Sequence, residues 1–175
     1  MSGEHQLVSK SITAHADDIL PISVIDGAVD WEIVGHKTET REDVEIISVH
    51  PPVQGPYVVM KVWWFTEDNP KGTTGLFTER DVQGKNEELL LTYWEAEGGR
   101  EEATGLDSDV AHIFKILAER IAKPKNTSPQ KEFLVQFVGY SCSDDDTMWW
   151  PAEDVEKTYL ELYEDWTFKK EQLDD

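Results

Sequence analysis

The sequence predicts an α+β protein made of two similar units, each a small curved three-stranded antiparallel sheet with a C-terminal helix packed across it. Three observations lead to this prediction. Short runs of β-branched and aromatic residues are bounded by proline and glycine, which is typical of strands joined by turns. Each half then has a segment with apolar residues at helical spacing. The order of three strands and a helix occurs twice in the 175 residues, which indicates an internal duplication.

An N-terminal arm is expected at residues 1–28, before a first unit at 29–100. A short apolar patch in the arm, 19–25, is interpreted either as a strand or as an extended segment docked on the body. Within the first unit, the segments richest in β-branched and aromatic residues predict three strands, at 44–49, 57–65 and 75–78.

Two other segments of the first unit have a different character. Residues 31–34 are a further short strand candidate, whereas the polar run at 36–43 is typical of a loop or hairpin connection. Asn86 is placed to cap a helix over 87–97, which Gly98 and Gly99 would end. One face of this helix carries three apolar side chains, those of Leu90, Tyr93 and Trp94.

An acidic linker at 101–109 precedes the second unit, at 110–170. This unit repeats the order of the first, with predicted strands at 113–117, 133–138 and 148–150. A final amphipathic helix is expected over 154–168, and the apolar residues along one face of it are Tyr159, Leu162, Tyr163 and Trp166.

The chain is strongly acidic, with 36 Asp and Glu against 16 Lys and Arg and a formal net charge of -20. Binding nucleic acid through its phosphates requires Lys and Arg. The composition therefore argues against direct nucleic-acid binding and favours a basic protein or peptide as partner. The alternative interpretation is that the acidity only keeps the protein soluble.

The sequence lacks the patterns that catalytic, metal and membrane-spanning segments require. The single cysteine, Cys142, excludes an internal disulfide and fits a reducing compartment. One cysteine and five scattered histidines lack metal-ligand spacing. No Gly-x-Ser-x-Gly, phosphate-loop or His-Glu-x-x-His motif occurs, and no apolar run approaches the length of a membrane span. We therefore expect a soluble intracellular protein that is not an enzyme and has no cofactor.

Two stretches of the second half carry a family resemblance. Residues 133–140 read Phe-Leu-Val-Gln-Phe-Val-Gly-Tyr, and after an acidic loop residues 149–155 read Trp-Trp-Pro-Ala-Glu-Asp-Val before the final helix. This pattern, over about residues 110–168, resembles the chromodomain family. The first half is similar to the family more weakly, through a central strand at 59–63 and a helix at 87–94, and such degenerate units include the chromoshadow domains.

The resemblance implies binding of methylated lysine on a histone tail, which adds to the domain as a β-strand. Three aromatic rings of the family surround the methylammonium group and attract it through cation–π interactions. The three cage positions correspond to Ala111, Phe137 and Tyr140, of which the first is not aromatic. Phe114 and Trp150 lie close in sequence and are candidates for the third ring.

The resemblance also implies positions for polar and core residues. The family's acidic-loop carboxylate corresponds to Asp144 or Asp145, and the peptide-contacting positions before the helix correspond to Asp154 and Glu156. Trp149 corresponds to a core tryptophan of the family, so we expect it to be buried.

Three functions remain open, and the first two place the protein in the nucleus. The first is a non-catalytic interaction module of a chromatin complex, built from tandem chromo-like units that bind a chromatin protein, a heterochromatin factor or a second copy of the chain. Its partner surface would include the rings on both faces of one strand, Trp63, Trp64 and Phe65. The alternative is a histone-tail reader that recognises methylated lysine through a partial aromatic cage. The third is an acidic mimic of nucleic acid that blocks a basic site.

Overall fold

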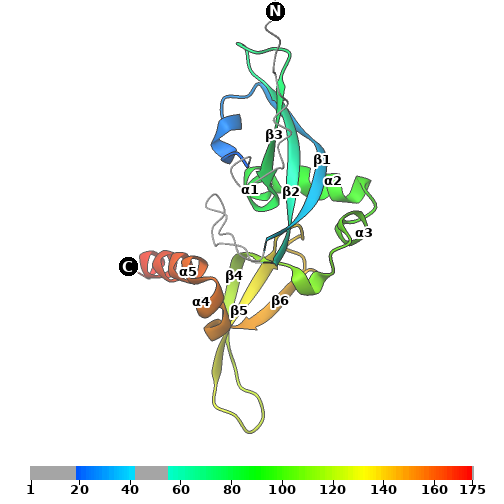
Figure 1. Cartoon of the computed structure of the whole chain (residues 1–175). Helices are drawn as coiled ribbons and strands as arrows, with labels where there is room; N and C mark the ends of the chain where they lie inside the picture. Colours follow the sequence, from blue (N-terminus) through cyan, green and yellow to red (C-terminus); the bar gives the residue numbers. More distant parts are fainter. Residues whose placement is uncertain (1–18, 42–54, 175) are drawn as a thin grey trace, which may run out of the picture.

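The computed structural model describes residues 19–41 and 55–174. It contains two three-stranded antiparallel sheets, in the orders β1-β2-β3 and β4-β5-β6, and each is followed in the chain by helices (Figure 1). The predicted α+β class, with two such sheets and C-terminal helices, is confirmed. The predicted strand at 44–49 and most of the N-terminal arm lie outside the described residues. No helix in the described ranges is long and apolar enough to cross a membrane.

The first sheet consists of three strands: β1 (Asp30–Arg41), β2 (Gly55–Phe65) and β3 (Thr73–Thr78). β1 pairs with β2 from Asp30 to Arg41. The pairing register shifts by one residue between Ile33 and Gly35 and then continues to the end of the strand. The prediction of a loop over 36–43 is therefore wrong as far as Arg41. β1 is an edge strand whose backbone pairs with β2 along this run. The polar His36 is half-buried, and its Nδ1 lies 2.6 Å from the Tyr93 hydroxyl of the helical segment that follows the sheet.

Three helices follow the first sheet: α1 (Glu79–Lys85), α2 (Glu87–Ala96) and α3 (Arg100–Thr104). The prediction for α2 is confirmed, and the Asn86 side chain accepts a hydrogen bond from the Leu89 amide at 3.0 Å as its N-cap. α1 was not predicted, because its seven residues are too few to show an apolar repeat. α3 occupies the start of the expected acidic linker.

The N-terminal apolar patch is docked on the first sheet. Ile19 forms a parallel bridge with Leu76, and a short 3-10 helix, Ile22–Ile25, packs on the core. Of the two interpretations left open for 19–25, docking on the body is observed, but residues 22–25 form a 3-10 helix and are not extended. The buried core below it combines side chains of the strands and of α1 and α2, among them Val58, Met60, Val62, Phe77, Leu90 and Trp94.

The second sheet consists of β4 (Ile113–Ala122), β5 (Gln130–Phe137) and β6 (Thr147–Pro151). The single helix expected over 154–168 is instead two helices, α4 (Ala152–Thr158) and α5 (Leu160–Leu173). They meet at Tyr159, whose φ of -131° and ψ of 54° are not helical. The buried Tyr159 hydroxyl accepts a hydrogen bond from the Ile113 amide, so tertiary contact accompanies the break.

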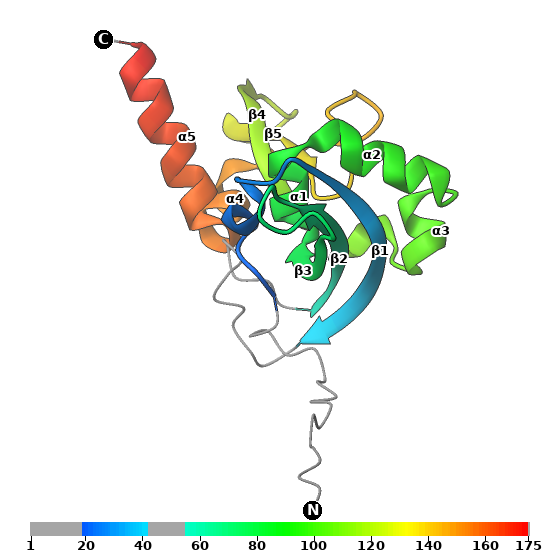
Figure 2. The ribbon, with the colours of Figure 1, turned by 90° about the horizontal axis from the view of Figure 1, so that it is seen from above.

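α5 extends away from the body on the side opposite α2 and α3 (Figure 2). No residue of α5 is fully buried. Its attachment runs through Trp166, whose indole Nε1 donates to Glu119 of β4 at 3.0 Å, and through an ion pair between Lys170 and Glu119. The hydrogen bonds from Lys170 and Trp166 lower the pKa of the Glu119 carboxyl to about 2.

Candidate functional site

The two halves meet where α1 of the first half contacts the turn that follows β5 of the second. The Arg80 guanidinium donates to the backbone carbonyls of Ile113 and Phe114. The Gln83 side chain accepts from the Gly139 amide at 2.8 Å and donates to the Tyr140 carbonyl at 3.2 Å. Side chains of the first half therefore satisfy backbone groups of the second, which ties the two sheets together.

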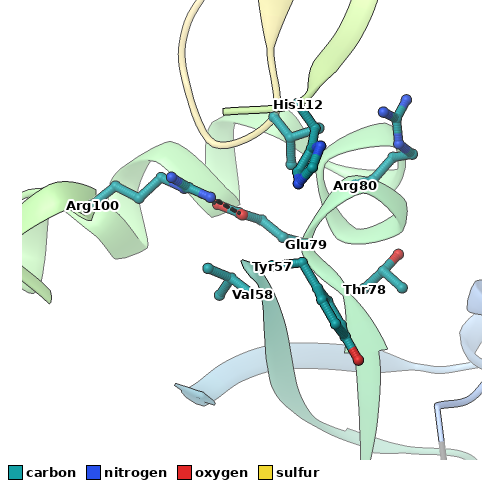
Figure 3. Close-up of a pocket in the computed structure, with 8 residues that line it drawn as sticks. Tyr57, Val58, Thr78, Glu79, Arg80, Arg100 and His112 are labelled. Carbon is teal, nitrogen blue, oxygen red and sulfur yellow. Dashed lines mark hydrogen bonds and ion pairs between the residues drawn. The ribbon is translucent and has the colours of Figure 1, made fainter. Parts of the chain in front are cut away.

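A buried ion pair lies directly beneath this turn. Arg100 Nε and Nη2 donate to the two carboxylate oxygens of Glu79 at 2.8 Å each (Figure 3). Trp94 Nε1 donates a third hydrogen bond to Glu79, at 2.9 Å. Glu79 and Arg100 are 2% and 7% exposed. Gly139 has a φ of 85°, and a Cβ at this position would meet both partners of the pair. The Gly139 backbone therefore packs directly against the ion pair, and a residue with a Cβ would clash with it.

The space beside the ion pair is too small to hold a ligand. Glu79 and Arg100 point toward each other in Figure 3, and His112 approaches them from the second half. The cavity that these residues line has a volume of about 20 Å³, roughly that of one water molecule. Burial lowers the pKa of the His112 imidazole, whose Nε2 lies 3.1 Å from the Pro56 carbonyl oxygen. This region is a structural junction.

A larger open pocket lies on the second half, where three aromatic side chains converge. Phe137, Tyr140 and Trp150 all line a pocket of about 400 Å³. The rings of Phe137 and Trp150 meet edge to face, with centroids 6.1 Å apart and an interplanar angle of 63°. Ala111 lines the same pocket and adds no ring, so Trp150 supplies the third aromatic side chain. The pocket is within the size range of ligand-binding cavities.

Strand register explains how these rings come together. Side chains alternate between the two faces of a strand, so Phe137 shares a face of β5 with Phe133. Trp150 of β6 stands opposite Phe133 in the ladder and is therefore on that face as well. Tyr140 follows three residues after Phe137, beyond the left-handed Gly139, and its carbonyl is held by Gln83 and by the buried Gln136. The pocket is thus built on fixed backbone.

Carboxylates surround the rings. Glu101 of α3 and the loop residues Asp145 and Asp146 line the pocket, so both halves of the chain contribute acidic groups. The Tyr140 hydroxyl donates to Glu101 at 3.1 Å, and Ser141 Oγ donates to Asp146 at 2.5 Å. Burial raises the pKa of the Tyr140 hydroxyl, which therefore stays protonated as a donor. Within the described part of the chain, none of the three carboxylates pairs with a Lys or Arg.

The other residues expected near a peptide lie elsewhere. Asp144 is exposed and does not line the pocket, and Asp154 and Glu156 are exposed on α4. Phe114 does not line it either, and its ring lies under the Lys115 ammonium group at 5.7 Å. Of the candidate residues in the second unit, the pocket brings together Phe137, Tyr140, Trp150 and Asp145.

The expectation that Trp149 is a buried core residue is wrong. Trp149 is half-buried, and the Arg120 guanidinium lies 4.1 Å from its ring centroid. The reason is the alternation along β6: Trp150 takes the face of Phe133, which places Trp149 on the opposite face. Two adjacent tryptophans therefore have separate surroundings.

The aromatic run of the first half divides in the same way. Trp64 is buried in the first core, with its ring centroid 5.6 Å from that of Phe77. Trp63 and Phe65 are partly exposed on the other face, with ring centroids 5.4 Å apart. The predicted partner surface is thus reduced to two rings, because Trp64 is not available to a partner.

The contribution of the first half to the pocket could not be predicted from the sequence. Glu101, Gln83 and Arg100 hold or line the Gly139–Tyr140 turn, although they lie far from it in sequence. No local pattern marks them, since Glu101 is one of several acidic residues in the expected linker. Asp146 was recognisable only as part of the acidic loop. Among the described residues, no cluster of His, Cys, Asp and Glu is arranged to hold a metal ion.

Comparison of the chain with known proteins identifies no relative. No family model matches the chain, and no curated protein or solved structure matches it.

Proposed function

We propose that the chain is a non-catalytic binding module that recognises a methylated lysine within a basic protein tail, such as that of a histone. The observation that carries the proposal is the convergence of Phe137, Tyr140 and Trp150 on one open pocket. The side chains come from a strand, a turn and a second strand that the ladder and the junction hold in place.

The chemistry of the pocket suits a cation with an apolar surface. Aromatic faces attract a methylammonium group through their quadrupoles and contact its methyl groups. The carboxylates of Glu101, Asp145 and Asp146 add negative potential at the rim without a neutralising cation among the described residues. The net charge of -20 would speed the approach of a basic tail, most strongly at low salt.

We also propose that each half is a chromo-like unit, the first half a divergent form and the second half a clearer one. We propose further that the protein works on chromatin in the nucleus. Supporting this, the sequence pattern at 133–155 and the pocket fall on the same strands. In addition, both halves share the order of three antiparallel strands followed by helices.

A second function, a protein-interaction module of a chromatin complex, is favoured by exposed apolar side chains outside the pocket. Trp63 and Phe65 form a partly exposed pair on the first sheet. On α5, Phe168 and Leu173 are 62% and 86% exposed. Dimerisation or binding of a chromatin protein would use such surfaces. This role is compatible with recognition of methylated lysine by the aromatic pocket.

Calorimetry with histone-tail peptides tests the proposal. A trimethyl-lysine peptide is expected to bind more tightly than its unmodified form. Trp150→Ala is expected to weaken binding of the methylated form about tenfold, because a desolvated cation–π contact contributes about 1–2 kcal/mol. Trp149→Ala is the matched control, since this neighbouring tryptophan lies on the other face of β6. Equal binding of both peptides across a panel of histone lysine sites would reject methyl-lysine recognition.

A further inference from the structure

A second hollow adjoins the aromatic pocket at the junction of the two halves. This junction groove, of about 510 Å³, shares three lining residues with the pocket, Glu101, Tyr140 and Asp146. The rest of its lining comes largely from the first half: α2 contributes Leu91 and Trp94, and the following segment contributes Gly98, Gly99 and Glu102. The groove therefore begins where the pocket ends and runs onto the other half of the chain.

The groove is negatively charged. Glu101 and Glu102 are exposed at its wall, and Asp146 stands at the border with the pocket. Arg100 also lines the groove, but Glu79 pairs with this guanidinium in the interior. Glu102 forms no ion pair with a Lys or Arg in the part of the chain that the structure describes. The carboxylates thus face the groove without a cationic partner.

The shape of the groove leaves room for a peptide backbone. Gly98 and Gly99 have φ values of 90° and 105°, and a Cβ on either would meet no heavy atom within 4 Å. The main chain of the protein is therefore exposed on one wall, where an approaching chain meets no side chain. Trp94, which also lines the groove, is buried, and its hydrogen bond to Glu79 fixes the position of its indole.

We infer that the junction groove is a second subsite for the same ligand, and that it binds a second cationic side chain, Arg or Lys, a few residues from the methylated lysine. The inference rests on the proposed function of the aromatic pocket. The first half then takes part in recognition directly, with Glu101 and Glu102 as specificity-determining residues. A tail with one isolated methyl-lysine would fill only one of the two subsites.

The shared wall makes the two subsites reachable by one extended peptide. Successive residues of an extended chain advance about 3.3 Å. Because Glu101, Tyr140 and Asp146 line both hollows, a peptide that leaves the pocket past Tyr140 enters the groove directly, where Glu102 also lines the wall. Arg and Lys have long side chains, which extend the distance that the peptide can span. These side chains can keep their charged group in water at the wall of the groove.

A scanning series of synthetic peptides tests the inference on the full chain. Each peptide holds one trimethyl-lysine in an alanine- and serine-based sequence, and a single Arg is moved through the flanking positions. We expect one or two Arg positions to tighten binding by up to about fivefold at low salt, the range of an exposed ion pair. Glu102→Gln is expected to remove this gain and to leave binding of the peptide without Arg unchanged. Glu171→Gln on the exposed face of α5 is the control with the same change in charge.

The outcomes separate the two proposals. If no Arg position tightens binding, or if the gain is the same in wild type and Glu102→Gln, the second subsite is rejected while methyl-lysine recognition stands. If the peptides without Arg bind equally with and without the methyl groups, the proposed function of the pocket fails. A gain that Glu102→Gln removes and Glu171→Gln retains supports the subsite.

Discussion

Glu79 at the start of α1 and Arg100 at the start of α3 form a bidentate ion pair in the interior, directly below the Gly139 backbone of the other half. The pair joins two helices of the first half and supports the turn that places Tyr140 at the candidate site. The Arg100 guanidinium also lies over the Tyr140 ring, 5.5 Å from its centroid. Folding of the junction and shape of the pocket are therefore coupled through these residues.

Removing one partner of the buried pair is expected to be strongly destabilising. Arg100→Ala leaves the Glu79 carboxylate buried without its cation, which costs about 3–5 kcal/mol of unfolding free energy. Urea unfolding followed by circular dichroism measures this loss. Lys157→Ala, which breaks the exposed pair with Glu153, is the control and should leave the midpoint nearly unchanged. An unchanged midpoint for Arg100→Ala would contradict the role given to the pair.

A side chain at position 139 is expected to disturb the junction. Gly139→Ala puts a Cβ against Arg100 and Glu79 at a φ of 85°, and such crowding costs about 1–3 kcal/mol. The Tyr140 side chain should move as well, so peptide affinity is expected to fall together with stability. Gly84→Ala in α1 is the matched control, because a Cβ there meets nothing within 4 Å. In a helix this control should stabilise by up to about 1 kcal/mol. Equal stability of the two variants in urea unfolding would argue against close contact at Gly139.

The attachment of α5 is expected to weaken in acid. The pKa of Glu119 is about 2 in the folded protein, below the ordinary value of a glutamate. A depressed folded pKa stabilises the fold above the unfolded pKa, near 4.5, and this contribution is lost as the pH falls toward 2.

The indole N–H resonance of Trp166 reports this change, because the group donates to Glu119. Its chemical shift should titrate between pH 4.5 and 2 in the wild type. Glu119→Gln is expected to remove that titration. In this variant the urea midpoint of unfolding measured in acid should lie closer to the urea midpoint measured at neutral pH than it does in the wild type. A Trp166 resonance that does not respond to pH in the wild type would exclude the contact.

Much of the chain could be predicted because its signals are local. The strand at 57–65 is β-branched and aromatic throughout, and Asn86 stands where a helix cap is needed. β1 was missed beyond Val34, because its polar residues are stabilised by pairing with β2 and not by their own propensity. α1 was missed because its seven residues are too few to show an apolar repeat, and because Arg80 and Gln83 bond to residues distant in sequence, in the other half.

The sequence by itself determined the class of the fold, the repeated order of elements, the acidic surface and the aromatic candidates Phe137, Tyr140 and Trp150. Only the tertiary structure decided that Trp150 and not Trp149 joins Phe137, since the strand register selects the face on which each ring lies. It also brought Glu101 and Glu102 of the first half beside Tyr140. Contacts of this kind depend on long-range packing around the buried pair of Glu79 and Arg100, which no local pattern in the sequence encodes.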